Sequence, residues 1–161
     1  MGTAPIREVI DGALTPHRTG SGQITADGPP LDLSARQSLA LALAIHELAT
    51  NAVKYGALST KTGHIDVSWQ IGAPGSTELF RLSWIERGGP EVKKPERRGF
   101  GSTLVERALA QDFRGTVALD FNPLGVRCEL TSEMRNLEID LQDDLTSDDV
   151  NQAPAGQAPR P

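Results

Sequence analysis

His46-Glu47-Leu48-Ala49-Thr50-Asn51-Ala52-Val53-Lys54-Tyr55-Gly56 is the most informative stretch of this sequence. Its apolar residues continue a series with helical spacing, which predicts the second half of a long helix that is capped by Ser34 and ends at Gly56. The apolar stripe consists of Leu41, Ile45, Leu48, Ala52 and Tyr55. We therefore expect these five side chains to face the core.

The opposite face of this helix carries Glu47, Thr50, Asn51 and Lys54. A carboxylate can take up a proton, an amide oxygen is a suitable ligand for Mg²⁺, and an ammonium group can hold a phosphate. Helical spacing alone, however, favours a solvated face with a contact between the glutamate and the lysine. The choice between these interpretations requires the rest of the sequence.

Length and composition exclude several classes of protein. The chain has 161 residues, which suits one domain with a sizeable core, and it has no apolar run long enough to cross a membrane. Its single cysteine, Cys128, excludes an internal disulfide, suits the reducing cytoplasm and is expected to pack in a strand. The net charge is −5, and residues 134–161 hold six acidic residues against two arginines. The rest is nearly neutral, which does not favour nucleic acid binding.

The order of predicted elements indicates the fold class. Helices are expected at 5–14, 34–55 and 102–113, and strands at 23–26, 64–71, 78–85, 115–121 and 126–131. The later strands form two hairpins, which favours an α+β fold with a largely antiparallel sheet and its helices on one face. Residues 1–135 are the expected domain. Residues 136–161 form an acidic, proline-containing tail that we expect to be largely disordered.

A glycine-rich segment separates the two hairpins. Gly99 and Gly101 lie at the start of a predicted helix, where free backbone N–H groups and a partial positive charge can hold an anion. Five cations precede them, namely Arg87, Lys93, Lys94, Arg97 and Arg98. Together they suit a polyphosphate, although an ordinary turn before a helix is an equally good interpretation of the glycines alone. Glu86, at the end of a strand, is either a solvated acid or an acceptor for an exocyclic amine such as that of adenine.

Three motifs occur in order along the chain, and together they are far more specific than any one of them. They are His46-Glu47-x-x-x-Asn51-x-x-Lys54-Tyr55-Gly56-Ala57-Leu58-Ser59, Trp84-x-Glu86-x-Gly88-Gly89-Pro90 and Gly99-Phe100-Gly101. This pattern resembles the catalytic, ATP-binding domain of HWE-type bacterial sensor histidine kinases, within the GHKL superfamily. The resemblance covers residues 6–133. It implies a Bergerat-type α/β sandwich with a mixed sheet of about five strands against about three helices.

The resemblance also implies roles for individual residues. Asn51 is expected to hold the Mg²⁺ of Mg-ATP, and Glu47 occupies the position of the general base of GHKL ATPases. Lys54 and Tyr55 are expected to reach phosphate and to cover the nucleotide, and Glu86 to accept from the adenine amine. The remaining nucleotide-binding residues are expected to be Gly88, Gly89, Arg98, Gly99, Gly101 and Ser102. Residues 91–98 correspond to the ATP lid. His46 and Trp84 mark the family, and we expect both to pack rather than to take part in chemistry.

This sequence departs from the family pattern in two ways. The helix pair that carries the phosphoacceptor histidine is absent, so we expect the kinase reaction to need a dimerisation domain, with a response regulator as the next partner. Autophosphorylation of this chain alone is not expected. Val126 follows Gly125 where many relatives carry threonine, which leaves more of adenine recognition to Glu86. The alternatives are a degenerate module that docks regulators without ATP, and a GHKL ATPase that activates water.

Overall fold

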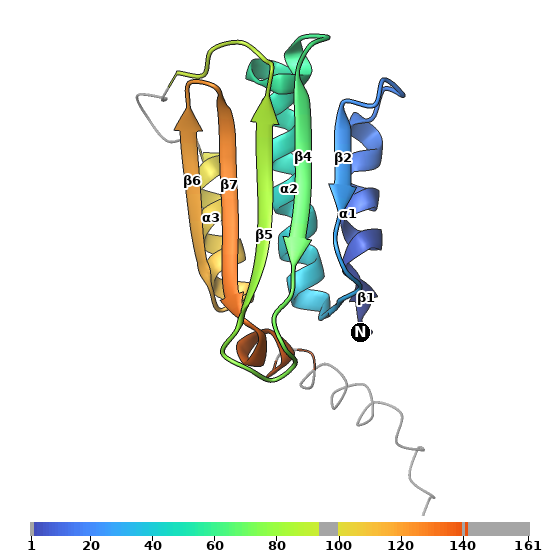
Figure 1. Ribbon diagram of the computed structural model, residues 1–161, viewed down its shortest axis with the longest axis vertical. Helices are drawn as coiled ribbons and strands as arrows, with labels where there is room; N and C mark the ends of the chain where they lie inside the picture. Colours follow the sequence, from blue (N-terminus) through green and yellow to red (C-terminus); the bar gives the residue numbers. More distant parts are fainter. Residues whose placement is uncertain (1, 94–99, 140, 142–161) are drawn as a thin grey trace, which may run out of the picture.

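Three helices cover one face of a five-stranded sheet in the computed structural model, which describes residues 2–93, 100–139 and 141 (Figure 1). The helices are α1 (Ile6–Leu14), α2 (Ala35–Tyr55) and α3 (Phe100–Asp112). The strands of the sheet are β2 (Ile24–Asp27), β4 (His64–Gln70), β5 (Leu79–Arg87), β6 (Thr116–Asn122) and β7 (Gly125–Glu133). Short pieces complete the fold, namely β1 (Ala4–Pro5), β3 (Asp32–Leu33), and the 3₁₀ turns η1 (Thr15–His17) and η2 (Ala57–Ser59). The predicted α+β class is confirmed.

The sheet is mixed and has the strand order β2-β4-β5-β7-β6. Both predicted hairpins are present, since β4 pairs antiparallel with β5 and β6 pairs antiparallel with β7. The two hairpins join through β5 and β7, and β2 adds to β4 in parallel at one edge. As a result β5 is the central strand, and its inward-facing residues Phe80, Leu82, Trp84 and Glu86 point toward the helices at alternate positions.

The long helix α2 begins and ends where the sequence predicts. The hydroxyl of Ser34 accepts from the backbone N–H of Gln37, and the Gln37 side chain accepts from the backbone N–H of Ser34, which closes a capping box. Gly56 terminates the helix, and its N–H donates to the carbonyl of Ala52. The prediction was wrong for one member of the apolar stripe, because Tyr55 is 73% exposed. The last turn of α2 borders a cavity instead of packed side chains.

Inward-facing side chains of the sheet and the three helices form one core. Among its largest fully buried members are Trp84, Phe80, Phe113, Ile6, Leu41 and Ile45. Cys128 on β7 belongs to this core, as expected for strand packing, and burial raises the pKa of its thiol to about 12. No helix in the described part of the chain is long and apolar enough to cross a membrane.

The packed body continues beyond residue 135, where we placed the boundary of the domain. Residues 134–139 are helical, and the Leu137 side chain is only 2% exposed. The Gln37 side chain of α2 also donates to the carbonyl of Leu137, at 3.1 Å. The predicted tail at 136–161 therefore begins inside a helix that contacts the first turn of α2 through Gln37. Most of that tail lies outside the described residues.

Candidate functional site

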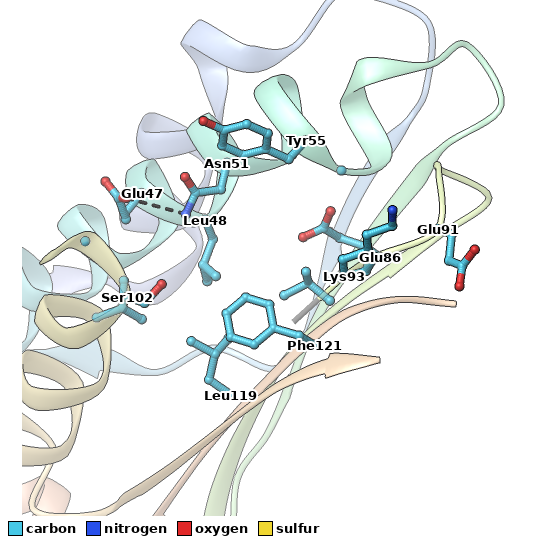
Figure 2. A pocket seen from close by; sticks show the side chains of 15 residues that line it. Glu47, Leu48, Asn51, Tyr55, Glu86, Glu91, Lys93, Ser102, Leu119 and Phe121 are labelled. Carbon is cyan, nitrogen blue, oxygen red and sulfur yellow. Dashed lines mark hydrogen bonds between the residues drawn. The ribbon is translucent and has the colours of Figure 1, made fainter. Parts of the chain in front are cut away.

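A cavity of about 570 Å³ lies between the C-terminal half of α2, the start of α3 and the adjoining ends of β5, β6 and β7 (Figure 2). Its apolar wall is formed by Leu48, Val105, Leu119, Phe121 and Val126. Its polar residues are Glu47, Asn51, Tyr55, Glu86, Glu91, Lys93 and Ser102, which are joined by Gly56, Val92 and Gly101. A concave apolar pocket with a few polar groups at its borders is the usual form of a site for a small molecule.

One end of the cavity is formed by the polar face of α2. The Asn51 side chain donates from Nδ2 to Oε1 of Glu47 at 3.4 Å, so the two side chains lie one helical turn apart and point to the same side (Figure 2). This contact uses the nitrogen of the amide and leaves Oδ1 of Asn51 outside it. An amide oxygen beside a carboxylate is a suitable pair of ligands for a hard cation.

The first turn of α3 borders the same end of the cavity. Gly101 and Ser102 line it, and a Cβ atom on Gly101 would overlap the Glu47 carboxylate. Glycine at this position therefore allows the backbone of α3 to lie directly against the polar face of α2. Because the first N–H groups of a helix have no partner within the helix, this 13-residue helix offers donors for a phosphate next to Asn51 and Glu47.

Glu86 lies at the other end of the cavity, with only 4% of its surface exposed. Its Oε1 accepts from the backbone N–H of Ala57 at 3.0 Å, and its Oε2 accepts from the indole N–H of Trp84 at 2.9 Å. Burial raises the pKa of the Glu86 carboxyl, and the two donors oppose that rise because they stabilise the ionised form. The result is a buried hydrogen-bond acceptor at the apolar end of the pocket.

The cavity brings together six of the predicted site residues, from all three motifs. These are Glu47, Asn51, Tyr55, Glu86, Gly101 and Ser102. Among the described residues, Lys54, Gly88 and Gly89 do not line it, while Arg98 and Gly99 lie outside the described residues. Gly88 and Gly89 are instead required by the conformation and close packing of the backbone. Gly88 has a φ of 70°, and a Cβ atom on Gly89 would lie 2.8 Å from Cα of Ala57.

Sequence reasoning missed the apolar wall and one pair of histidines. Leu119, Phe121 and the other wall residues look like ordinary core positions in the sequence, and only the fold turns them toward the cavity. His46 is exposed rather than packed, and its Nδ1 lies 3.3 Å from Nε2 of His17. Burial and the neighbouring His46 lower the pKa of His17, which ends the 3₁₀ turn η1.

Together the donor set suits a magnesium ion that arrives with a ligand. Within the described ranges, no group of three or more His, Cys, Asp or Glu side chains could hold a metal ion by itself. Asn51 and Glu47 offer oxygen ligands from one face of α2. Mg²⁺ usually keeps several waters and binds through one or two protein groups together with phosphate oxygens, so these two residues fit such an ion.

Comparisons with known proteins point to one group of enzymes. No family model matches the chain. It is 38% identical over 130 residues to a blue-light-activated histidine kinase of Brucella anthropi, a match that covers 80% of this chain and 26% of the relative. The chain thus spans about a quarter of the length of the curated relatives that it matches.

Two solved structures share its fold at low sequence identity. The histidine kinase domain of the Erythrobacter litoralis blue-light-activated histidine kinase has a TM-score of 0.64 at 13% identity, over 84% of this chain and 62% of that domain. The histidine kinase ThkA, solved in complex with the response regulator protein TrrA, has a TM-score of 0.59 at 13% identity, over 83% of this chain and 42% of that kinase.

Proposed function

Because this chain belongs to the family of histidine kinase catalytic domains, with blue-light-activated kinases of the HWE type among its relatives, we propose that it binds Mg-ATP in the cavity described above and supplies the γ-phosphoryl group to a histidine. The acceptor histidine would belong to a dimerisation domain, which the described residues do not include. One observation carries this proposal. A single cavity is lined at one end by a buried acceptor, Glu86, and at the other end by Glu47, Asn51 and the first turn of α3.

Adenine fits the apolar end of the cavity. Leu119, Phe121 and Val126 offer a surface for a flat ring, and Glu86 offers the acceptor that the exocyclic amine of adenine requires. Val126 has no hydroxyl, so Glu86 is the side chain that we assign to the amine. Tyr55, which is exposed and lines the same cavity, would cover the bound nucleotide.

The triphosphate then extends toward α3. Backbone N–H groups of the first turn of that helix and the Ser102 hydroxyl would bind its oxygens, and Lys93 lies at the border of the cavity. Asn51 and Glu47 would hold the Mg²⁺, which neutralises charge on the phosphates when it is bound. Within the described residues, no other cluster combines these groups around one cavity.

Phosphoryl transfer depends mainly on positioning, so the partner domain decides whether the bound ATP reacts. None of the three histidines lines the cavity within the described residues, which supports an acceptor on another domain. Glu47 would orient the incoming imidazole. The response regulator would be the next partner, as in the ThkA complex with TrrA.

Isothermal titration calorimetry with and without Mg²⁺ tests the proposal. The wild-type chain should bind ATP more tightly with Mg²⁺, whereas Asn51→Ala should lose this dependence because it removes an oxygen ligand at little cost in packing. Thr50→Ala is the matched control, since Thr50 is the preceding residue on α2 and its hydroxyl donates to the carbonyl of His46. Absence of ATP binding by the folded wild-type chain would contradict the proposal and favour a docking module.

A further inference from the structure

Trp84 is one of the two tryptophans of the chain, and both are buried. It lies on the central strand β5, is fully buried, and faces the same side as Glu86 two residues later. A buried tryptophan usually needs a partner for its N–H, and Trp69 on the adjacent strand finds one in the carbonyl of Pro29 at 2.7 Å. Trp84 instead donates to a carboxylate oxygen of Glu86 at 2.9 Å. A core side chain is thereby linked directly to the cavity.

The other oxygen of Glu86 is held from a second side. The backbone N–H of Ala57 donates to Oε1, just after α2 ends at Gly56. A Cβ atom on Gly56 would overlap that oxygen, so the end of α2 closes tightly around the carboxylate. The glutamate side chain has three rotatable bonds, yet these two donors define one orientation. Each carboxylate oxygen can accept a further hydrogen bond, which leaves acceptor capacity for a ligand in the cavity.

The two donors also preserve the chemical identity of the acceptor. Burial favours the neutral acid, and a neutral carboxyl group can donate as well as accept. Such a group could bind the carbonyl oxygen of guanine as readily as the amine of adenine. Hydrogen bonds from Trp84 and Ala57 favour the ionised form, which only accepts.

We propose that Trp84 is a positioning residue that sets nucleobase specificity, because its indole N–H fixes the Glu86 carboxylate as an acceptor for the exocyclic amine of adenine. This inference rests on the proposed function, since it requires adenine to bind beside Glu86. Trp84 itself does not line the cavity and acts through the carboxylate to which it donates.

The test compares Trp84→Phe with Trp69→Phe, which removes the other buried indole of the chain. Dissociation constants for Mg-ATP and Mg-GTP are measured by calorimetry after circular dichroism has confirmed folding. Trp84→Phe should weaken ATP by roughly 5- to 20-fold, which is less than the loss of a whole charge-assisted hydrogen bond because the backbone N–H of Ala57 still holds Glu86, and it should leave GTP nearly unchanged. Trp69→Phe should leave the ratio of the two constants unchanged. Equal loss for ATP and GTP in Trp84→Phe would overturn the inference.

A double variant separates positioning from packing. In a Glu86→Ala background, Trp84→Phe should produce no further change in the ratio of ATP to GTP affinity, because the group through which it acts is gone. The same change in both backgrounds would assign Trp84 to packing alone. If Glu86→Ala leaves the wild-type ratio intact, the proposed adenine site fails. If Glu86→Ala relaxes the ratio and Trp84→Phe does not, only the role of Trp84 fails.

A second substitution covers the case in which Trp84→Phe does not fold. In the Trp69→Phe chain, Trp84 is the single tryptophan, so it can be replaced through biosynthesis by benzothienylalanine. This analogue keeps the shape of the indole and has sulfur in place of the N–H. The same loss of selectivity is expected, and full selectivity in the analogue would overturn the inference.

Discussion

Glu86→Ala should weaken ATP binding far more than GTP binding. The carboxylate is 4% exposed and borders the apolar end of the cavity, where an adenine amine would donate to it. A hydrogen bond to a charged group contributes about 1.5–3 kcal/mol, and about 1.4 kcal/mol is a factor of ten, so ATP affinity should fall roughly 10- to 150-fold. Guanine presents a carbonyl oxygen at the same place, so GTP has no hydrogen bond to Glu86 that the substitution could remove. The ratio of ATP affinity to GTP affinity should therefore fall by nearly the same factor.

The effect of Glu86→Ala on stability depends on pH, and its sign follows from the pKa. Burial raises the pKa of this carboxyl in the folded state, so the folded protein binds the proton more tightly than the unfolded chain does. The stability that Glu86 contributes is thus present at low pH and is lost as the pH rises through the folded pKa. Relative to wild type, the variant should gain stability as the pH rises from the ordinary range of a glutamate through the folded pKa.

Calorimetry at saturating Mg²⁺ with both nucleotides checks the binding prediction, and urea unfolding at several pH values checks the stability prediction. Glu129→Ala is the matched control, because Glu129 is an exposed acid on the neighbouring strand β7 that does not line the cavity, as far as the described residues go. An unchanged ratio of ATP to GTP affinity in folded Glu86→Ala protein would refute the assignment of the adenine site.

Three further predictions concern other parts of the domain. Gly101→Ala should fold but bind Mg-ATP about tenfold more weakly, a change of ~1.4 kcal/mol, because its Cβ atom displaces the Glu47 carboxylate. Gly12→Ala on α1, where a Cβ atom meets nothing within 4 Å, should instead stabilise the fold by about 0.5–1 kcal/mol and leave binding intact in the same calorimetric assay. The Thr25 hydroxyl is the main cause of a lowered pKa of Asp66, so the stability that Asp66 contributes is present at neutral pH and is lost on acidification. Because Asp66 is partly exposed, Asp66→Asn should lower the free energy of unfolding in urea by less than about 1 kcal/mol at neutral pH. This difference from wild type should shrink below about pH 4, and a difference that stays constant with pH would contradict the prediction.

The sequence predicted most of the fold because periodicity is local. Alternation along β4 and β5, and the helical stripe of α2 with its cap at Ser34, each depend on residues close in the chain. The parallel pairing of β2 with β4 joins residues about 40 positions apart, such as Ile24 with Ile65, and no local pattern encodes it. Tyr55 was misplaced for a related reason, since periodicity does not reveal that the last helical turn borders a cavity.

The candidate site was predictable only in part. Glu47 and Asn51 are polar residues one turn apart on α2, and Glu86 is an acid near the end of β5. The structure brings all three to one cavity. The bond between Trp84 and Glu86 could have been anticipated, because residues two apart in a strand share a face and a buried indole needs an acceptor. The contact of His17 with His46 could not, since it joins the 3₁₀ turn η1 to the middle of α2 across 29 positions.

A crystal structure of the chain with Mg²⁺ and a non-hydrolysable ATP analogue tests the central claim most directly. We predict that the adenine amine lies within hydrogen-bonding distance of Glu86, that the phosphates meet the first turn of α3, and that Oδ1 of Asn51 coordinates the ion. An analogue bound outside this cavity, or bound in it with its adenine away from Glu86, would contradict the account.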